Sequence, residues 1–171
     1  MIDAQQAAFH YTLLLLGFSI VFLILFWAIV FGMQHKKASE VRERINDLIY
    51  ADTWIDAEEF LQLRQEGPPF KSQGYYSSDH EFVGVYILHN ITKDMYYVGQ
   101  AKKVLTRVSK HLTGHGNGDV YADFKYGDKF LVNVIPLVNS GYASIDDLER
   151  DTIERFDAFN SGYNRTRGNR R

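Results

Sequence analysis

The chain has 171 residues, of which 46% are hydrophobic, with a formal net charge of −2 and no cysteine. This length fits one modest domain with appendages and excludes two full domains. The missing cysteines exclude disulfide scaffolds, thiolate zinc sites and cysteine nucleophiles, and the near-neutral charge excludes polyanion binding over the whole surface.

Residues 12–33, TLLLLGFSIVFLILFWAIVFGM, form the most apolar stretch of the chain, with 15 Leu, Ile, Phe or Val among 22 residues. A helix of this length spans roughly 33 Å at about 1.5 Å per residue, which matches a hydrocarbon core of about 30 Å. A cleaved signal peptide is disfavoured, because no Lys or Arg precedes the run and the run is too long. A buried core helix of this size is rare in so small a protein, so the pattern predicts a single transmembrane helix.

Four basic residues follow this segment closely, and none precedes it: Lys36, Lys37, Arg42 and Arg44. Cytoplasmic flanks of membrane helices are enriched in Lys and Arg. The sequence therefore predicts a short extracytoplasmic N-terminus at residues 1–11 and a cytoplasmic C-terminal part. The expected location is the plasma or inner membrane, with the lipid bilayer as a partner.

Residues 34–80 are expected to form a juxtamembrane helical stalk and linker. Apolar residues recur at helical spacing between residues 38 and 51, and a second short helix is expected to begin near Asp56 and to end at Gly67-Pro68-Pro69. Residues 71–79 have the composition of a linker. The stalk is either a spacer or dimerisation element, giving a homodimer through the membrane helix or stalk, or an amphipathic helix that packs on its own domain.

Residues 81–171 are expected to form the folded domain. Residues 81–90 and 95–99 are predicted to be the arms of a hairpin, and residues 129–138 a third strand. Helices are predicted over residues 102–112, 119–125 and 144–159, the last two capped by Asp119 and Ser144. The expected fold class is α+β, with a small three-stranded antiparallel sheet flanked by helices and preceded by the transmembrane helix and stalk.

Two glycine-tyrosine triplets on the predicted hairpin, Gly84-Val85-Tyr86 and Tyr97-Val98-Gly99, resemble the paired motifs of the GIY-YIG nuclease superfamily. Further along the chain, Arg107 lies eight residues after Gly99, and His111 follows one helical turn later. Glu149 in the last predicted helix and Gly162-Tyr163-Asn164 complete the resemblance, which covers roughly residues 83–168.

The resemblance implies catalytic roles for six residues: Tyr86, Tyr97, Arg107, His111, Glu149 and Asn164. A tyrosine with an ordinary pKa near 10 is a weak base, so Tyr86 is expected to orient the attacking water, or to deprotonate it with help from a nearby cation. Arg107 presents a rigid fork of donors that suits phosphate oxygens. For each of these residues, packing or simple solvent exposure is the alternative to a catalytic role.

Glu149 is the one acidic residue that the resemblance implies as a metal ligand. Magnesium keeps most of its waters and often binds through one or two protein oxygens, so the expected cofactor is a single Mg²⁺ or Mn²⁺ ion. His111 and His115 have the spacing of a helical metal pair, but Gly114 intervenes and no third ligand is evident, so zinc is not expected.

The expected substrate is DNA, although residues 80–171 carry 13 Lys and Arg against 11 Asp and Glu. This even balance indicates little tight nonspecific binding, and no separate recognition module is visible, so little sequence specificity is expected. Substrate contacts are predicted for six residues: Gly99, Lys102, Lys103, Lys110, Arg165 and Arg167. The basic tail, which also contains Arg170 and Arg171, is alternatively a solvated, frayed end.

The favoured hypothesis is a membrane-anchored, metal-dependent endonuclease that hydrolyses DNA phosphodiester bonds at the cytoplasmic face. The alternative is a catalytically inactive GIY-YIG fold that serves as a tethered DNA-binding or protein-binding adaptor. A structural membrane protein with an accidental motif match is a third interpretation. Metal-dependent cleavage of DNA separates the first hypothesis from the other two.

Overall fold

The computed structural model describes residues 4–48, 54–65 and 81–169. The chain divides into two compact units, Met1–Val41 and Arg42–Arg171. The proposed end of the second helix at Gly67-Pro68-Pro69, the linker at residues 71–79 and the last two arginines lie outside the described residues.

Helix α1 (Ala4–Leu48) runs without interruption through the expected transmembrane segment and into the expected stalk. The two predicted elements are therefore one helix, since neither proline nor glycine separates Met33 from Leu48. Its apolar stretch is exposed and is long and apolar enough to cross a membrane. Within the second unit, the end of this helix belongs to the domain core, because Ile45 is fully buried beside Val85 and Leu148.

The domain is built on a four-stranded antiparallel sheet in the order β1-β4-β2-β3. Strands β2 (Gly84–Asn90), β3 (Met95–Ala101) and β4 (Phe130–Pro136) correspond to the three predicted strands. The prediction of three strands was nevertheless wrong, because β1 (Ile55–Asp56) pairs with Val132 and Leu131 of β4. A strand of two residues is too short to show an alternating pattern, and it lies in a segment that we expected to be stalk.

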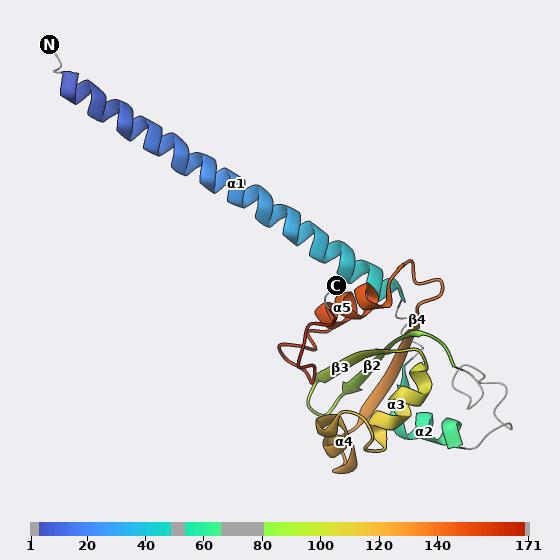
Figure 1. Cartoon of the computed structure of the whole chain (residues 1–171). Coiled ribbons are helices and arrows are strands. Elements are labelled where there is room, and N and C mark those ends of the chain that lie inside the picture. The colour runs from blue at the N-terminus through green and yellow to red at the C-terminus, as the bar shows by residue number, and fades with distance from the viewer. Residues whose placement is uncertain (1–3, 49–53, 66–80, 170–171) are drawn as a thin grey trace. The chain divides into compact units, whose positions relative to one another are not determined.

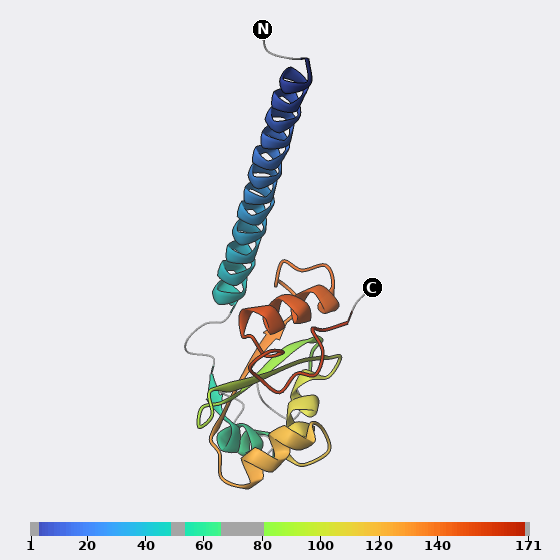
Figure 2. The same cartoon turned by 90° about the vertical axis from the view of Figure 1, so that its left-hand side faces the viewer.

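Helices cover both faces of this sheet (Figure 1). On one face, α2 (Ala57–Gln65), α3 (Val104–Leu112) and α4 (Gly118–Lys125) enclose a core that includes Tyr86 and Leu88. On the other face, α5 (Ile145–Arg155) packs on Val85, Ile87 and Val98. Figure 2 shows the same two helical layers after a turn of 90°. Successive side chains of a strand point to opposite faces of the sheet. Tyr86 therefore lies in the core beneath α2, α3 and α4, whereas Val85 and Ile87 lie in the core beneath α5.

The helix starts follow their capping residues. The carboxylate of Asp56 accepts hydrogen bonds from the main-chain N–H groups of Glu58 and Glu59 at the start of α2. The Ser144 hydroxyl accepts from the N–H of Asp146 and caps α5, as predicted. Helix α4 is capped by Asn117 and not by Asp119, because the Asn117 side chain accepts from the first free N–H groups. Both residue types are favourable caps, so their neighbouring positions did not distinguish them.

Candidate active site

Strands β2 and β3 bring the two glycine-tyrosine triplets face to face. Tyr86 pairs with Gly99, and Tyr97 pairs with Leu88, so all four side-chain positions point to the same face of the sheet. The Tyr86 ring lies across Gly99, where an added Cβ atom would come within 2.2 Å of the Tyr86 hydroxyl oxygen. Glycine is therefore required opposite this tyrosine, and the two triplets form one structural unit.

Helix α3 carries Arg107 and His111, and its start is held by a carboxylate from outside the helix. Glu81 accepts hydrogen bonds from the main-chain N–H groups of Leu105 and Thr106, and its side chain pairs with Arg64 of α2 at 2.7 Å. A carboxylate at a helix N-terminus compensates the unsatisfied N–H groups and the helix dipole. This anchoring fixes α3 along the sheet and places His111 beside β2.

Three rings form a compact cluster between α3 and the sheet. The hydroxyl oxygen of Tyr86 lies 2.8 Å from Nε2 of His111, and both side chains are almost completely buried. The ring of Tyr97 lies 4.9 Å from the His111 ring and 6.1 Å from the Tyr86 ring, measured between centroids. Three of the six predicted catalytic residues are thus in mutual contact, and the exposed Arg107 lies one turn before His111 on α3.

Burial controls the protonation states in this cluster. It raises the pKa of Tyr86 far above its ordinary value, and the neighbouring Tyr97 adds to this effect, while a hydrogen bond from Arg107 and its positive charge oppose it. Burial, assisted by the positive charge of Arg107, lowers the pKa of His111 to about 4. At neutral pH the cluster therefore contains a neutral phenol and a neutral imidazole.

Glu149 projects from α5 and is half-buried. The side-chain amide of Gln100 donates hydrogen bonds to Glu149 at 2.9 Å and to Asp146 at 2.7 Å. Burial raises the pKa of Glu149, and the charge of Asp146 adds to this rise, whereas hydrogen bonds from Gln100 and the main chain of Asn169 oppose it. Asp146 and Glu149 therefore share the side-chain amide of Gln100.

A cavity of about 260 Å³ lies beside Glu149. Tyr97 and Asn164 line it together with Glu149, so three of the predicted catalytic residues share this space. Tyr97 is the link between the cavity and the buried ring cluster, because its ring also contacts Tyr86 and His111. The other lining residues are Val98, Asn117, Ile153, Tyr163, Arg165, Thr166, Gly168 and Asn169.

Asn164 is fixed against β3 by both polar atoms of its side chain. Its carbonyl oxygen accepts from the N–H of Val98 at 2.8 Å, and its amide donates to the carbonyl of Val98 at 2.7 Å. The main-chain N–H of the preceding residue, Tyr163, donates to the carbonyl of Tyr96. The segment that follows α5 is therefore hydrogen-bonded along the strand that carries Tyr97.

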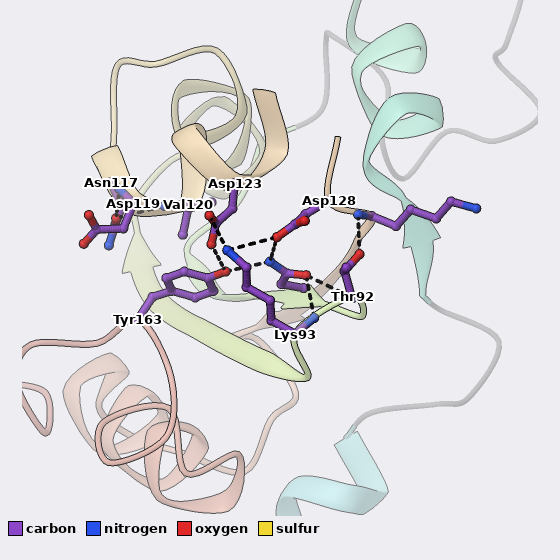
Figure 3. Close-up of polar contacts among 10 residues, drawn as sticks. Thr92, Lys93, Asn117, Asp119, Val120, Asp123, Asp128 and Tyr163 are labelled. Carbon is purple, nitrogen blue, oxygen red and sulfur yellow. Dashed lines mark hydrogen bonds and ion pairs between the residues drawn. The ribbon is translucent and has the colours of Figure 1, made fainter. Parts of the chain in front are cut away.

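A polar network holds the side-chain hydroxyl of Tyr163, the residue before Asn164 (Figure 3). Its hydroxyl donates to Asp123 at 2.6 Å and accepts from the Asn90 amide at 2.7 Å. Lys93 forms ion pairs with Asp123 at 2.5 Å and with Asp128 at 3.3 Å. These contacts join the β2–β3 turn, α4 and the C-terminal segment, and so they hold Asn164 in place.

The predicted substrate-binding residues are distributed unevenly around the cavity. Arg165 lines it and forms an ion pair with Asp119 at 3.1 Å. Arg167 lies over the ring of Phe159, and its guanidinium carbon is 4.9 Å from the ring centroid. Arg165 and Arg167 are both exposed, and Thr166, Gly168 and Asn169 of the same segment also line the cavity. The exposed Lys102, Lys103 and Lys110 lie outside the cavity lining, as does Gly99.

The carboxylates of Glu149, which lines the cavity, and of Asp146, which lies beside it on α5 outside the cavity lining, fit a magnesium ion better than a zinc ion. Two carboxylates, Glu149 and Asp146, converge on Gln100, and hard oxygen donors of this kind suit Mg²⁺ or Mn²⁺. Both ring nitrogens of His111 are occupied by hydrogen bonds within the protein. Among the described residues, no group of three or more His, Cys, Asp or Glu is arranged to hold a metal.

Sequence reasoning missed three contributors to the site: Gln100, Asp146 and the main chain of Asn117. The position of Gln100 directly after Gly99, and the three-residue spacing of Asp146 and Glu149 on one helix face, were usable signals. A main-chain donor leaves no side-chain signal at all.

A family model described as the GIY-YIG catalytic domain matches residues 82–164, which contain the ring cluster, Glu149 and Asn164. No curated protein and no solved structure is significantly similar to the chain.

Proposed function

Residues 82–164 form a GIY-YIG catalytic domain, and we propose that the protein is a metal-dependent endonuclease that hydrolyses DNA phosphodiester bonds with little sequence specificity. Members of this family are nucleases. The observation that carries the proposal is the convergence on Tyr97, which joins the buried pair of Tyr86 and His111 to the cavity that Glu149 and Asn164 line. The cavity is thus lined by the carboxylate of Glu149, the guanidinium of Arg165 and the phenol of Tyr97.

Each residue has a role that its environment supports. Glu149, with Asp146 and Gln100 beside it, would hold a single Mg²⁺ or Mn²⁺ ion, which supplies positive charge to the scissile phosphate and its leaving oxygen. Arg107 would bind a non-bridging phosphate oxygen through its guanidinium group. Asn164 fixes the position of β3, and Tyr97 shapes the wall of the phosphate pocket.

Tyr86 would orient the attacking water instead of attacking the phosphorus atom itself. Its hydroxyl is buried and its pKa is raised, so the phenol is protonated at neutral pH. The positive charge of Arg107 opposes this effect and favours the phenolate. Loss of the phenolic proton of Tyr86 would therefore require positive charge near its hydroxyl group when the substrate is bound.

We also propose substrate contacts for Arg165, which lines the cavity, for the exposed Lys102 and Lys103 just before α3, and for the exposed Lys110 in the last turn of α3. Arg167 and Gly99 have weaker support: Arg167 lies over Phe159, and Gly99 makes room for Tyr86.

Residues 12–33 would anchor the protein in the plasma or inner membrane. The exposed apolar stretch of α1 supports this proposal, and the basic residues Lys36, Lys37, Arg42 and Arg44 support an outside N-terminus and a cytoplasmic domain. Pairing of two copies is proposed through the membrane helix and not through the stalk, because Ile45 is buried in the domain. A C-terminal reporter active on the outer face would overturn the orientation, and release of the protein by alkaline carbonate would overturn the anchoring.

The nuclease proposal is tested with the full chain in detergent micelles and supercoiled plasmid, with Mg²⁺ or Mn²⁺ and with EDTA. We expect metal-dependent nicking that falls by about 100-fold or more in Glu149→Gln and in Arg107→Gln, because each removes charge stabilisation of the transition state. Glu154→Gln on the same helix as Glu149 and Lys125→Gln on α4 are matched exposed controls, and both should retain activity. DNA binding without nicking would favour the inactive adaptor, and nicking unaffected by Glu149→Gln would refute the proposed site.

A further inference from the structure

His111 is held by hydrogen bonds at both ring nitrogens. Its Nε2 atom lies 2.8 Å from the hydroxyl oxygen of Tyr86, and its Nδ1 atom accepts the main-chain N–H of Asn117 at 2.7 Å. The His111 side chain is fully buried.

The partner at Nδ1 decides which nitrogen carries the proton. A main-chain N–H group is always a donor, so Nδ1 must present a lone pair. A neutral imidazole has one proton, and that proton is therefore on Nε2. Nε2–H is then the donor to Tyr86, and the oxygen of Tyr86 is the acceptor.

The loop between α3 and α4 is built to bring this amide to the ring. An added Cβ atom at Gly116 would lie 2.4 Å from Nδ1 of His111, so a side chain there would displace the ring. Gly114 adopts a left-handed conformation with φ of 89°, and the N–H of His115 donates to the carbonyl of Lys110. At the other end, the side chain of Asn117 caps α4. Close approach to His111 thus explains Gly116, whereas Gly114 has its left-handed conformation and Gly118 has open space around it.

We infer that the main-chain amide of Asn117 fixes His111 as the Nε2–H tautomer, so that His111 serves Tyr86 as a hydrogen-bond donor and not as the base that removes its proton. The hydroxyl proton of Tyr86 then points away from His111. A phenolate at Tyr86 would be stabilised by Nε2–H of His111 together with the guanidinium of Arg107. The catalytic part of this inference rests on the proposed nuclease function, whereas the tautomer itself does not.

The tautomer is measured directly by two-bond ¹H–¹⁵N correlation NMR of the full chain in detergent micelles with ¹⁵N-labelled histidine. The signals of His111 are assigned by their loss in His111→Gln. We expect an unprotonated Nδ1 and a protonated Nε2 at pH 7. A protonated Nδ1, or an imidazolium with both nitrogens protonated, would overturn the inference.

Two variants of Asn117 isolate the role of its amide. The φ angle of −78° at this residue lies in the range of proline, so Asn117→Pro removes the N–H, and the Cδ atom that replaces this hydrogen displaces the His111 ring from its position 2.7 Å from the backbone nitrogen. Asn117→Ala keeps the N–H and loses the side-chain cap, as the proline variant also does. We expect the Nε2–H tautomer to persist in the alanine variant and to lose its dominance in the proline variant. Loss of that tautomer in the alanine variant would contradict the assigned role of the amide, and the wild-type spectrum tests the tautomer even where the proline variant does not fold.

Nicking assays separate a donor from a base. His111→Gln retains an N–H donor and has no basic nitrogen, whereas His111→Ala has neither. We expect the glutamine variant to nick at least tenfold faster than the alanine variant, and equal rates would overturn the donor role. A full chain with the expected tautomer and no nicking would refute the proposed function while leaving the tautomer assignment intact.

Discussion

Acidification should destabilise the domain through His111 over a defined pH range. Burial and the charge of Arg107 lower the pKa of this histidine from 6.5 to about 4 in the folded protein. Between these two values the unfolded chain binds a proton and the folded protein does not, so the free energy of unfolding falls as the pH falls. The stabilising contribution is fully present above about pH 6.5 and is fully lost below about pH 4.

The magnitude follows from the gap between the two pKa values. At about 1.4 kcal/mol per pH unit, the full loss is about 3 kcal/mol, and about 2.5 kcal/mol of it falls between pH 7.5 and 4.5. This is a large fraction of the stability of an ordinary domain, which is about 5–15 kcal/mol.

The assay is urea unfolding of the full chain in nonionic detergent micelles at several pH values, followed by tryptophan fluorescence. The difference in unfolding free energy between pH 7.5 and 4.5 should be about 2.5 kcal/mol larger for the wild type than for His111→Gln, because carboxylates contribute equally to both. His115→Gln, which changes an exposed histidine in the adjacent loop, should keep the wild-type pH dependence. Parallel pH dependences for the wild type and His111→Gln would refute the conclusion that His111 is buried and neutral.

Three further predictions concern packing, capping and substrate binding. Gly99→Ala should lower the unfolding free energy measured with urea by about 1–3 kcal/mol and should slow nicking, because the added Cβ atom would overlap the hydroxyl of Tyr86. The control variant Gly118→Ala, which has open space around it, should change neither quantity. Ser144→Ala should lower the unfolding free energy by about 1 kcal/mol through loss of the α5 cap, and an unchanged urea midpoint would contradict this. Arg165→Gln should reduce by about 1 the slope of log affinity for DNA against log salt concentration, measured by fluorescence anisotropy, and an equal slope would show that Arg165 does not contact phosphate.

The sheet and the ring cluster were predictable because their signals are local. The two triplets stand on adjacent strands of one hairpin, so antiparallel pairing brings Tyr86 opposite Gly99 without any knowledge of the rest of the chain. Helical spacing likewise places Arg107 and His111 one turn apart on α3. The apolar positions of α3 then determine that this helix packs on the sheet.

The features that escaped prediction depend on contacts between distant segments or on the main chain. Gln100 meets Asp146 across 46 positions of the sequence, and no periodicity in either segment indicates this pairing. Strand β1 contains two residues, and its pairing with β4 depends on how α2 packs. Every non-proline residue has a main-chain N–H group, so the sequence does not distinguish the one at Asn117. Only the folded loop shows that this group contacts His111.

The attachment of Asn164 to Val98 also changes how the domain meets other chains. Strand β3 stands at the end of the sheet, where unpaired N–H and C=O groups offer a template for a foreign strand. The Asn164 side chain occupies both main-chain groups of Val98, and the N–H of Tyr163 occupies the carbonyl of Tyr96, so the segment that follows α5 covers the middle of this edge. The opposite end of the sheet is β1, whose two residues offer little length for pairing. A chain that ended before Tyr163 would lose an active-site wall and acquire an aggregation-prone edge in the same step.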